Sequence, residues 1–183
     1  MRLLPRHTTS RLILALTSIV ALVSGVSAFL SARSQQKALL NEMVTAADQL
    51  SHGITAATWQ AMRADRRADA YEIMESIARQ QGIESIRIFN KEGLVTFSTD
   101  PKAAARVDKN AEACFLCHAR EAPLVRVSTP SRARVFRGLD GRRKLAMVTP
   151  VYNEPACSSA ACHAHPEERH VLGVLDVAMD VNP

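Results

Sequence analysis

Two short stretches of the chain carry residues that can bind a cofactor. The first reads Cys114-Phe115-Leu116-Cys117-His118, which is the Cys-x-x-Cys-His pattern that attaches a c-type haem. Two thiols at this spacing can each form a thioether with one vinyl group of the porphyrin, and the next residue can bind the iron. The pattern predicts Cys114 and Cys117 as attachment residues and His118 as the proximal ligand.

The second stretch repeats the pattern with a wider loop. Four residues separate Cys157 from Cys162, and His163 follows directly. Because the two stretches use all 4 cysteines of the chain, the sequence predicts two covalently attached c-type haems. Two other interpretations stay open. The four thiols could bind one Zn²⁺, or they could form disulfides after export, and neither needs the histidines.

The ligand on the far side of each iron decides what the haem can do. An open position lets the iron bind a small gas, whereas a second His or a Met closes it and favours electron transfer. His165 lies only two residues after His163, so we expect it to serve the other haem. Met62 is the second candidate. The remaining candidates fit a structural role better than ligation: surface exposure for His52 and His170, and core placement for Met74 and Met147. Cations near the motifs could pair with the haem propionates: Arg120, Arg143 and Lys144.

The N-terminal segment can cross a membrane. An uncharged run covers residues 12–32, and its apolar part, residues 12–30, is 19 residues long, just enough for a helix to cross the hydrocarbon core. Three arginines precede it, which predicts that the N-terminus is cytoplasmic and that the bulk of the chain is periplasmic. We interpret residues 1–33 as a cytoplasmic stub and an uncleaved signal anchor in a bacterial inner membrane. The alternative is a signal peptide cleaved at Val26-Ser27-Ala28.

Residues 34–81 are predicted to be helical. Apolar residues recur there at alternating spacings of three and four, which places them on one stripe: Leu40, Met43, Ala47, Leu50, Ile54 and Ala57. The stripe packs either on the same chain or on a second copy in a homodimer, and the sequence leaves both open. His52-Gly53 is a possible kink, and Gly82 is a C-cap signal after the last periodic residue.

Residues 82–183 show the alternation and turn residues of strands. Ile86 and Ile88 alternate with polar residues. Turns are predicted at residues 90–93 and at Asp140-Gly141. The other strands are expected at residues 94–99, 135–136, 144–148 and 171–179, the last one apolar enough to be central. A long helix followed by about five strands in hairpins predicts an α+β fold with an antiparallel sheet.

Five stretches together suggest a family. They are IRIFNKEGLVTFSTDP at residues 86–101, Val107-Asp108-Lys109, residues 150–155, HAHP at residues 163–166, and VLGVLDVAMDV at residues 171–181. With the two haem motifs, residues 61–181 resemble the periplasmic c-type haem sensor region of bacterial membrane histidine kinases and chemoreceptors. The resemblance implies a PAS- or Cache-like sheet with two haem-bearing loops. Such regions are normally followed by a second membrane helix, a HAMP linker and a transmitter. These are missing here, so we expect a fragment or a short relative.

The resemblance also supports both sixth-ligand candidates. His165-Pro166 belongs to one of the similar stretches, and Met62 lies where the similarity begins. It implies a membrane-anchored di-haem sensor domain that detects redox state or a small gas for signal transduction, without a catalytic domain. The rival hypothesis is a di-haem cytochrome that passes electrons between membrane and periplasmic partners. A haem enzyme and a zinc-stapled ligand-binding domain are weaker alternatives.

Composition limits the partners that we expect. The net charge is +5, but the arginines are scattered and aromatic residues make up only 4% of the chain, which argues against nucleic-acid binding. The expected partners are the membrane, a small gas or redox partner, and a second copy of the chain.

Overall fold

The computed structural model describes residues 6–119, 124, 126–138, 140–159 and 165–181. The chain divides into two compact units, Met1–Glu42 and Met43–Pro183. Helix α1 (Arg6–Arg63) contributes to both. By length and composition, one helix in the described part of the chain, Thr9–Arg63, is apolar enough to cross a membrane. This confirms the long apolar N-terminal helix, whereas its membrane insertion, orientation and cleavage stay predictions.

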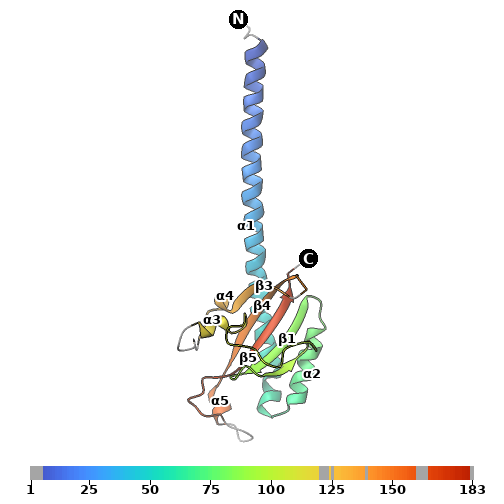
Figure 1. Ribbon diagram of the computed structural model, residues 1–183, viewed down its shortest axis with the longest axis vertical. Helices are drawn as coiled ribbons and strands as arrows, with labels where there is room; N and C mark the ends of the chain where they lie inside the picture. The colour runs from blue at the N-terminus through green and yellow to red at the C-terminus, as the bar shows by residue number, and fades with distance from the viewer. Residues whose placement is uncertain (1–5, 120–123, 125, 139, 160–164, 182–183) are drawn as a thin grey trace. The chain divides into compact units, whose positions relative to one another are not determined.

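The second unit is built on a five-stranded antiparallel sheet with the strand order β2-β1-β5-β4-β3. The strands are β1 (Ile83–Asn90), β2 (Val95–Ser98), β3 (Ala133–Arg137), β4 (Arg143–Tyr152) and β5 (Val171–Asp180). Figure 1 shows β5 (red) between β1 (green) and β4 (orange). The α+β class, the antiparallel sheet and the central position of the last strand are therefore confirmed.

Glycine shapes the turn between β1 and β2 and lets the first motif loop approach it. Gly93 has a φ of +78°, which favours glycine. Its carbonyl accepts a hydrogen bond of 2.8 Å from the Val107 N–H. A Cβ atom at position 93 would lie 2.4 Å from the Val107 carbonyl oxygen. The chain that leads to Cys114 is thus held against this turn.

The part of α1 in the second unit packs with α2 (Arg67–Ala78) against one face of the sheet. The buried side chains of this core are Ile54, Ala61, Ala70, Met74, Ile86, Phe97, Leu175 and Val177. The predicted stripe is only partly correct, because Ala57 is exposed while Ser51 and Thr58 are fully buried. Each of these two hydroxyls donates to the carbonyl four residues earlier, at 2.9 and 2.8 Å. The hydroxyls are therefore satisfied inside the core.

The predicted helical segment divides into two helices near residue 65. Asp65 has a φ of +54°. The N–H of Arg66 donates to the Ala61 carbonyl at 2.8 Å, and that of Asp65 donates to the Met62 carbonyl at 3.2 Å. These are the two bonds of a Schellman C-cap, here with aspartate in the left-handed position. The break allows α2 to turn back along β1, whereas α1 continues through His52-Gly53.

Candidate functional site

The first motif forms a single helical turn. Cys114 directly precedes α3 (Phe115–His118) and acts as its N-cap residue. Its carbonyl accepts hydrogen bonds from the N–H groups of Cys117 and His118, both at 3.1 Å. Residues three and four apart share one side of a helical turn. All three predicted residues accordingly line the same pocket, which we call the first pocket.

The first pocket lies between this turn and the face of the sheet that α1 and α2 do not cover. Its volume is about 360 Å³, within the range of ligand-binding pockets. The sheet and the preceding loop line it with apolar residues: Phe89, Val107, Ala113, Val148, Pro150 and Val174. Lys91 and Lys109 also line it. Glu92 lines the pocket too and pairs with Lys91 at 3.3 Å. A mainly apolar pocket with two thiols, an imidazole and the cation Lys109 fits a large flat apolar group that carries a carboxylate, as haem does.

The thiols of the first motif are neutral at physiological pH. Burial raises the pKa of Cys114, and the nearby carboxylates Asp176 and Glu112 raise it further. Burial also raises the pKa of Cys117. The three cysteines in the described ranges, Cys114, Cys117 and Cys157, all carry free thiols.

A network of four charged residues ties the first motif to the sheet. Asp176 on β5 is 2% exposed. It accepts hydrogen bonds from Arg87 on β1 at 2.6 Å and from Arg134 on β3 at 2.8 Å. The same two arginines contact Glu112, two residues before Cys114, at 2.8 and 3.4 Å. The loop that delivers the motif is therefore anchored to three strands.

The charges of this network stabilise one another. Burial raises the pKa of Glu112, but Arg134 and Arg87 outweigh it and hold that pKa below its usual value. Burial lowers the pKa of Arg87, and Asp176 and Glu112 more than compensate for this. Sequence reasoning missed these residues. One signal was present, because Asp176 interrupts the apolar run of β5, and a buried carboxylate requires paired cations.

The second motif begins on α5 (Pro155–Ser158). The Cys157 N–H donates to the Glu154 carbonyl at 2.7 Å, and the His165 N–H donates to the Cys157 carbonyl at 3.3 Å. Cys162 and His163 lie outside the described residues. Cys157 and His165 line a second pocket of about 270 Å³ together with Met62 from α1. The structure thus brings together one predicted thiol and both candidate sixth ligands.

Aromatic and basic residues complete the second pocket. Trp59, Tyr71 and Met74 line it from the two helices, and Arg63 and Arg67 also line it. Tyr71 stacks on Phe97 with ring centroids 4.6 Å apart. His165 was expected to serve the other haem, but it lines the pocket of its own motif and not the first pocket.

The two pockets lie on opposite faces of the sheet, towards the same end. Strand register pairs Val174 of β5 with Phe89 of β1 and with Pro150 of β4. This row faces the first pocket. Residues adjacent to this row in the same strands line the second pocket: Ile88, Gly173 and Val151. Because Cys114 and Cys117 are on one face and Cys157 is on the other, one four-thiolate zinc site receives no support. Within the described ranges, no three His, Cys, Asp or Glu side chains form a metal site.

The remaining candidate ligands lie elsewhere or belong to the core. His52 is exposed and lies 3.6 Å from Asp48. His170 is also exposed. Met147 is fully buried in the sheet. Met74 is fully buried in the core as well, but it also contributes to the lining of the second pocket.

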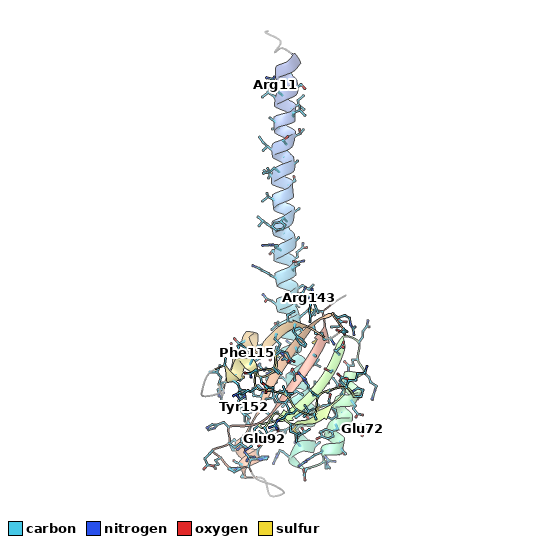
Figure 2. The ribbon with its side chains drawn as sticks, viewed as in Figure 1. Arg11, Glu72, Glu92, Phe115, Arg143 and Tyr152 are labelled. Carbon is cyan, nitrogen blue, oxygen red and sulfur yellow. The ribbon has the colours of Figure 1, made fainter. Side chains whose placement is uncertain are left out.

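Arg143 and Lys144, two of the three cations that could pair with propionates, line neither pocket. Lys144 pairs with Glu84 at 2.7 Å and with Asp140 at 3.3 Å. Arg143 and Lys144 begin β4, whereas both pockets contact its other end; Figure 2 shows Arg143 and Tyr152 at opposite ends of this strand. Arg120 lies outside the described residues. The cations that line the pockets are instead Lys91 and Lys109 for the first, and Arg63 and Arg67 for the second.

Comparison with known proteins adds no relative. No family model matches the chain, and no curated protein is significantly similar to it. The functional argument therefore depends on the residues and geometry described above.

Proposed function

We propose that this chain is a membrane-anchored, periplasm-facing di-haem c-type sensor domain that detects redox state or a small gas for signal transduction. One observation carries the proposal. Cys114, Cys117 and His118 line one mainly apolar pocket, and Cys157 of the other motif lines a second pocket on the opposite face of the sheet. Two separate pockets, each lined by at least one cysteine of its own motif, are what two covalent haems require.

The residues divide into attachment and iron-binding groups. Cys114 and Cys117 would hold the first haem, with His118 as the proximal ligand. Cys157 and Cys162 would hold the second, with His163 as its proximal ligand. A bound haem supplies an iron that changes its charge on reduction and, with one position open, binds a small gas. Met62 and His165 both line the second pocket, and either would be a candidate sixth ligand there.

Each pocket is lined by elements that could transmit a change of iron charge or ligation to the rest of the domain. Glu112 connects the first motif to β1, β3 and β5 through Arg87 and Arg134. The second pocket is lined by Trp59 and Met62 of α1. A shift of charge or ligation in either pocket would therefore act on the sheet or on the last turns of α1, as a two-state signalling element requires.

The decisive test is haem attachment. The full chain is produced in a bacterial host that carries a haem-attachment system, and covalent haem is counted by mass spectrometry. We expect two haems in the original chain and one in each of the variants Cys114→Ala/Cys117→Ala and Cys157→Ala/Cys162→Ala. A chain without covalent haem would overturn the proposal and favour the zinc or disulfide interpretation.

Absorption spectra then separate the kinds of signal. Reduced haem bands that shift with carbon monoxide indicate an open or labile iron and support gas sensing. Bands that stay in place indicate two closed irons, which leaves redox sensing or electron transfer.

Hydrogen exchange distinguishes these last two functions. A redox sensor predicts that amide protection in residues 43–63 differs between the oxidised and reduced chain. Identical protection in both states would favour electron transfer.

A further inference from the structure

A third pocket is lined by residues of α1, by the end of β4 and by the loop that leads into α4 (Thr129–Arg132). Its volume is about 530 Å³, within the range of ligand-binding pockets. It shares Trp59 with the second pocket, but Cys114, Cys117 and Cys157 do not line it. The proposed haem sites therefore leave this pocket without an assigned ligand.

A buried arginine forms part of the wall of the third pocket. Arg132 is 7% exposed. It donates to the Asp48 carboxylate at 2.5 Å and to the Thr149 hydroxyl at 3.2 Å. Its Nε, in contrast, has no hydrogen-bond partner among the described residues. A buried donor without a partner is costly, and an acceptor supplied from the pocket would remove that cost.

A second arginine of this pocket is exposed and carries an unneutralised charge. The guanidinium carbon of Arg126 lies 5.5 Å from the centroid of the Tyr152 ring. Such a contact orients the guanidinium but leaves its N–H groups available. Within the described ranges, Arg126 forms no ion pair, and neither the Trp59 N–H nor the Tyr152 hydroxyl forms a hydrogen bond. Since arginine and tryptophan side chains only donate, these groups need a ligand that accepts.

Two other titratable residues line the same pocket. Glu154 is exposed and has no cation partner in the part of the chain that the structure describes, so it opposes an anionic ligand. His52 is also exposed and lies 3.6 Å from Asp48. The unused donors of Arg126, Arg132 and Trp59 outnumber this one carboxylate, which favours an acceptor-rich ligand.

We propose that the third pocket binds a small organic carboxylate with a flat apolar part. The carboxylate pairs with Arg126, because a planar guanidinium matches the two oxygens of a carboxylate. The apolar part lies against the aromatic side chains of Trp59 and Tyr152. This site goes beyond the proposed function, and it does not require haem in either of the other pockets.

Isothermal titration calorimetry of the full chain in detergent tests the site. Three probes of similar shape are compared, namely the anion benzoate, the neutral benzamide and the cation benzylammonium. We expect saturable binding of benzoate and at least about 10-fold weaker binding of the other two, because a hydrogen bond to a charged group is stronger than a neutral one.

Substitutions then place the bound probe. Arg126→Gln should weaken benzoate binding about 10-fold. Arg79→Gln is the matched control, because Arg79 is exposed as well and lines none of the three pockets; it should leave the affinity unchanged. Glu154→Gln should strengthen benzoate binding, since it removes a like charge. Residues 126 and 154 are both exposed, so these substitutions leave the core intact.

Three results would overturn the proposal: no binding of benzoate, equal affinities for benzoate and benzamide, or an affinity for benzoate that Arg126→Gln does not change. Preferred binding of benzylammonium that is lost in Glu154→Gln would also overturn it and would assign the pocket to a cation. None of these results alters the number of covalent haems, so the proposed function is tested separately.

Discussion

Substitution of the buried Asp176 is the strongest single test of how the first motif is held in place. Its side chain is 2% exposed, and those of its partners Arg87 and Arg134 are 22% and 15% exposed. Removing one partner from a buried charge network typically costs about 3–5 kcal/mol, because the remaining charges lose their compensation. Asn keeps the shape and part of the hydrogen bonding, and both arginines keep Glu112. We therefore expect Asp176→Asn to lower the free energy of unfolding by about 3 kcal/mol, at the lower end of that range.

Thermal or urea unfolding of the full chain, followed by circular dichroism, measures this change. For a domain of this size, 3 kcal/mol corresponds to a fall in Tm of roughly 10 °C. Asp180→Asn is the matched control on the same strand. Its carboxylate is 24% exposed and pairs with Arg142, which is 52% exposed. An exposed pair of this kind contributes at most about 1 kcal/mol. If Asp176→Asn costs no more than Asp180→Asn, the network does not anchor the motif and the reasoning fails.

Three further predictions concern the motif loops and the glycines. Gly93→Ala should destabilise the chain by more than about 1 kcal/mol, because the φ of Gly93 is +78° and the new Cβ would lie 2.4 Å from a carbonyl oxygen. Gly53→Ala, in an open helical position, should stabilise the chain by up to about 1 kcal/mol. Equal effects of the two substitutions in urea unfolding would contradict this. Two arginines hold the pKa of Glu112 below its usual value of 4.5. The contribution of Glu112 to the free energy of unfolding is therefore present above pH 4.5 and is lost as the pH falls through the lower folded pKa. Glu112→Gln should flatten the acid side of the plot of stability against pH, and an unchanged plot would refute the assignment. In the chain without haem, iodoacetamide should modify Cys114 more slowly than Cys157 at neutral pH. The reason is that the Cys114 thiol is buried and its pKa is raised, which keeps it protonated. Peptide mass spectrometry after timed quenching measures the two rates, and equal rates would contradict the prediction.

The strands were predictable because their signals are local. The alternation of Ile86 and Ile88 and the turn at Gly93 depend only on neighbouring residues. The central position of β5 also followed from sequence, since a strand between two others with both faces covered can be apolar throughout. The burial pattern of α1 was less predictable. Ser51 and Thr58 take core positions because each hydroxyl bonds to the backbone of its own helix.

The spacing of the motif residues predicted only part of the candidate site. The positions of Cys114, Cys117 and His118 along one helical turn already imply a common pocket. That Cys157 lies on the opposite face depends on the registers of β1, β4 and β5, and no short motif encodes these. The same holds for Asp176, whose charge was visible in the sequence but whose partners Arg87 and Arg134 come from two other strands.

Lys144 shows why nearness in sequence misleads on a strand. Lys144 and Pro150 are only six residues apart, but at ~3.3 Å per residue six residues of extended chain cover roughly 20 Å. Pro150 lines the first pocket, whereas Lys144 is neutralised by acidic residues at the other end of the sheet. Lys91 reaches the same pocket from far earlier in the chain because the β1–β2 turn lies beside it. Of the two cations that line the first pocket, Lys91 lies 3.3 Å from Glu92, whereas no ion pair involves Lys109 in the described part of the chain. Lys109 is therefore the better partner for a carboxylate in this pocket.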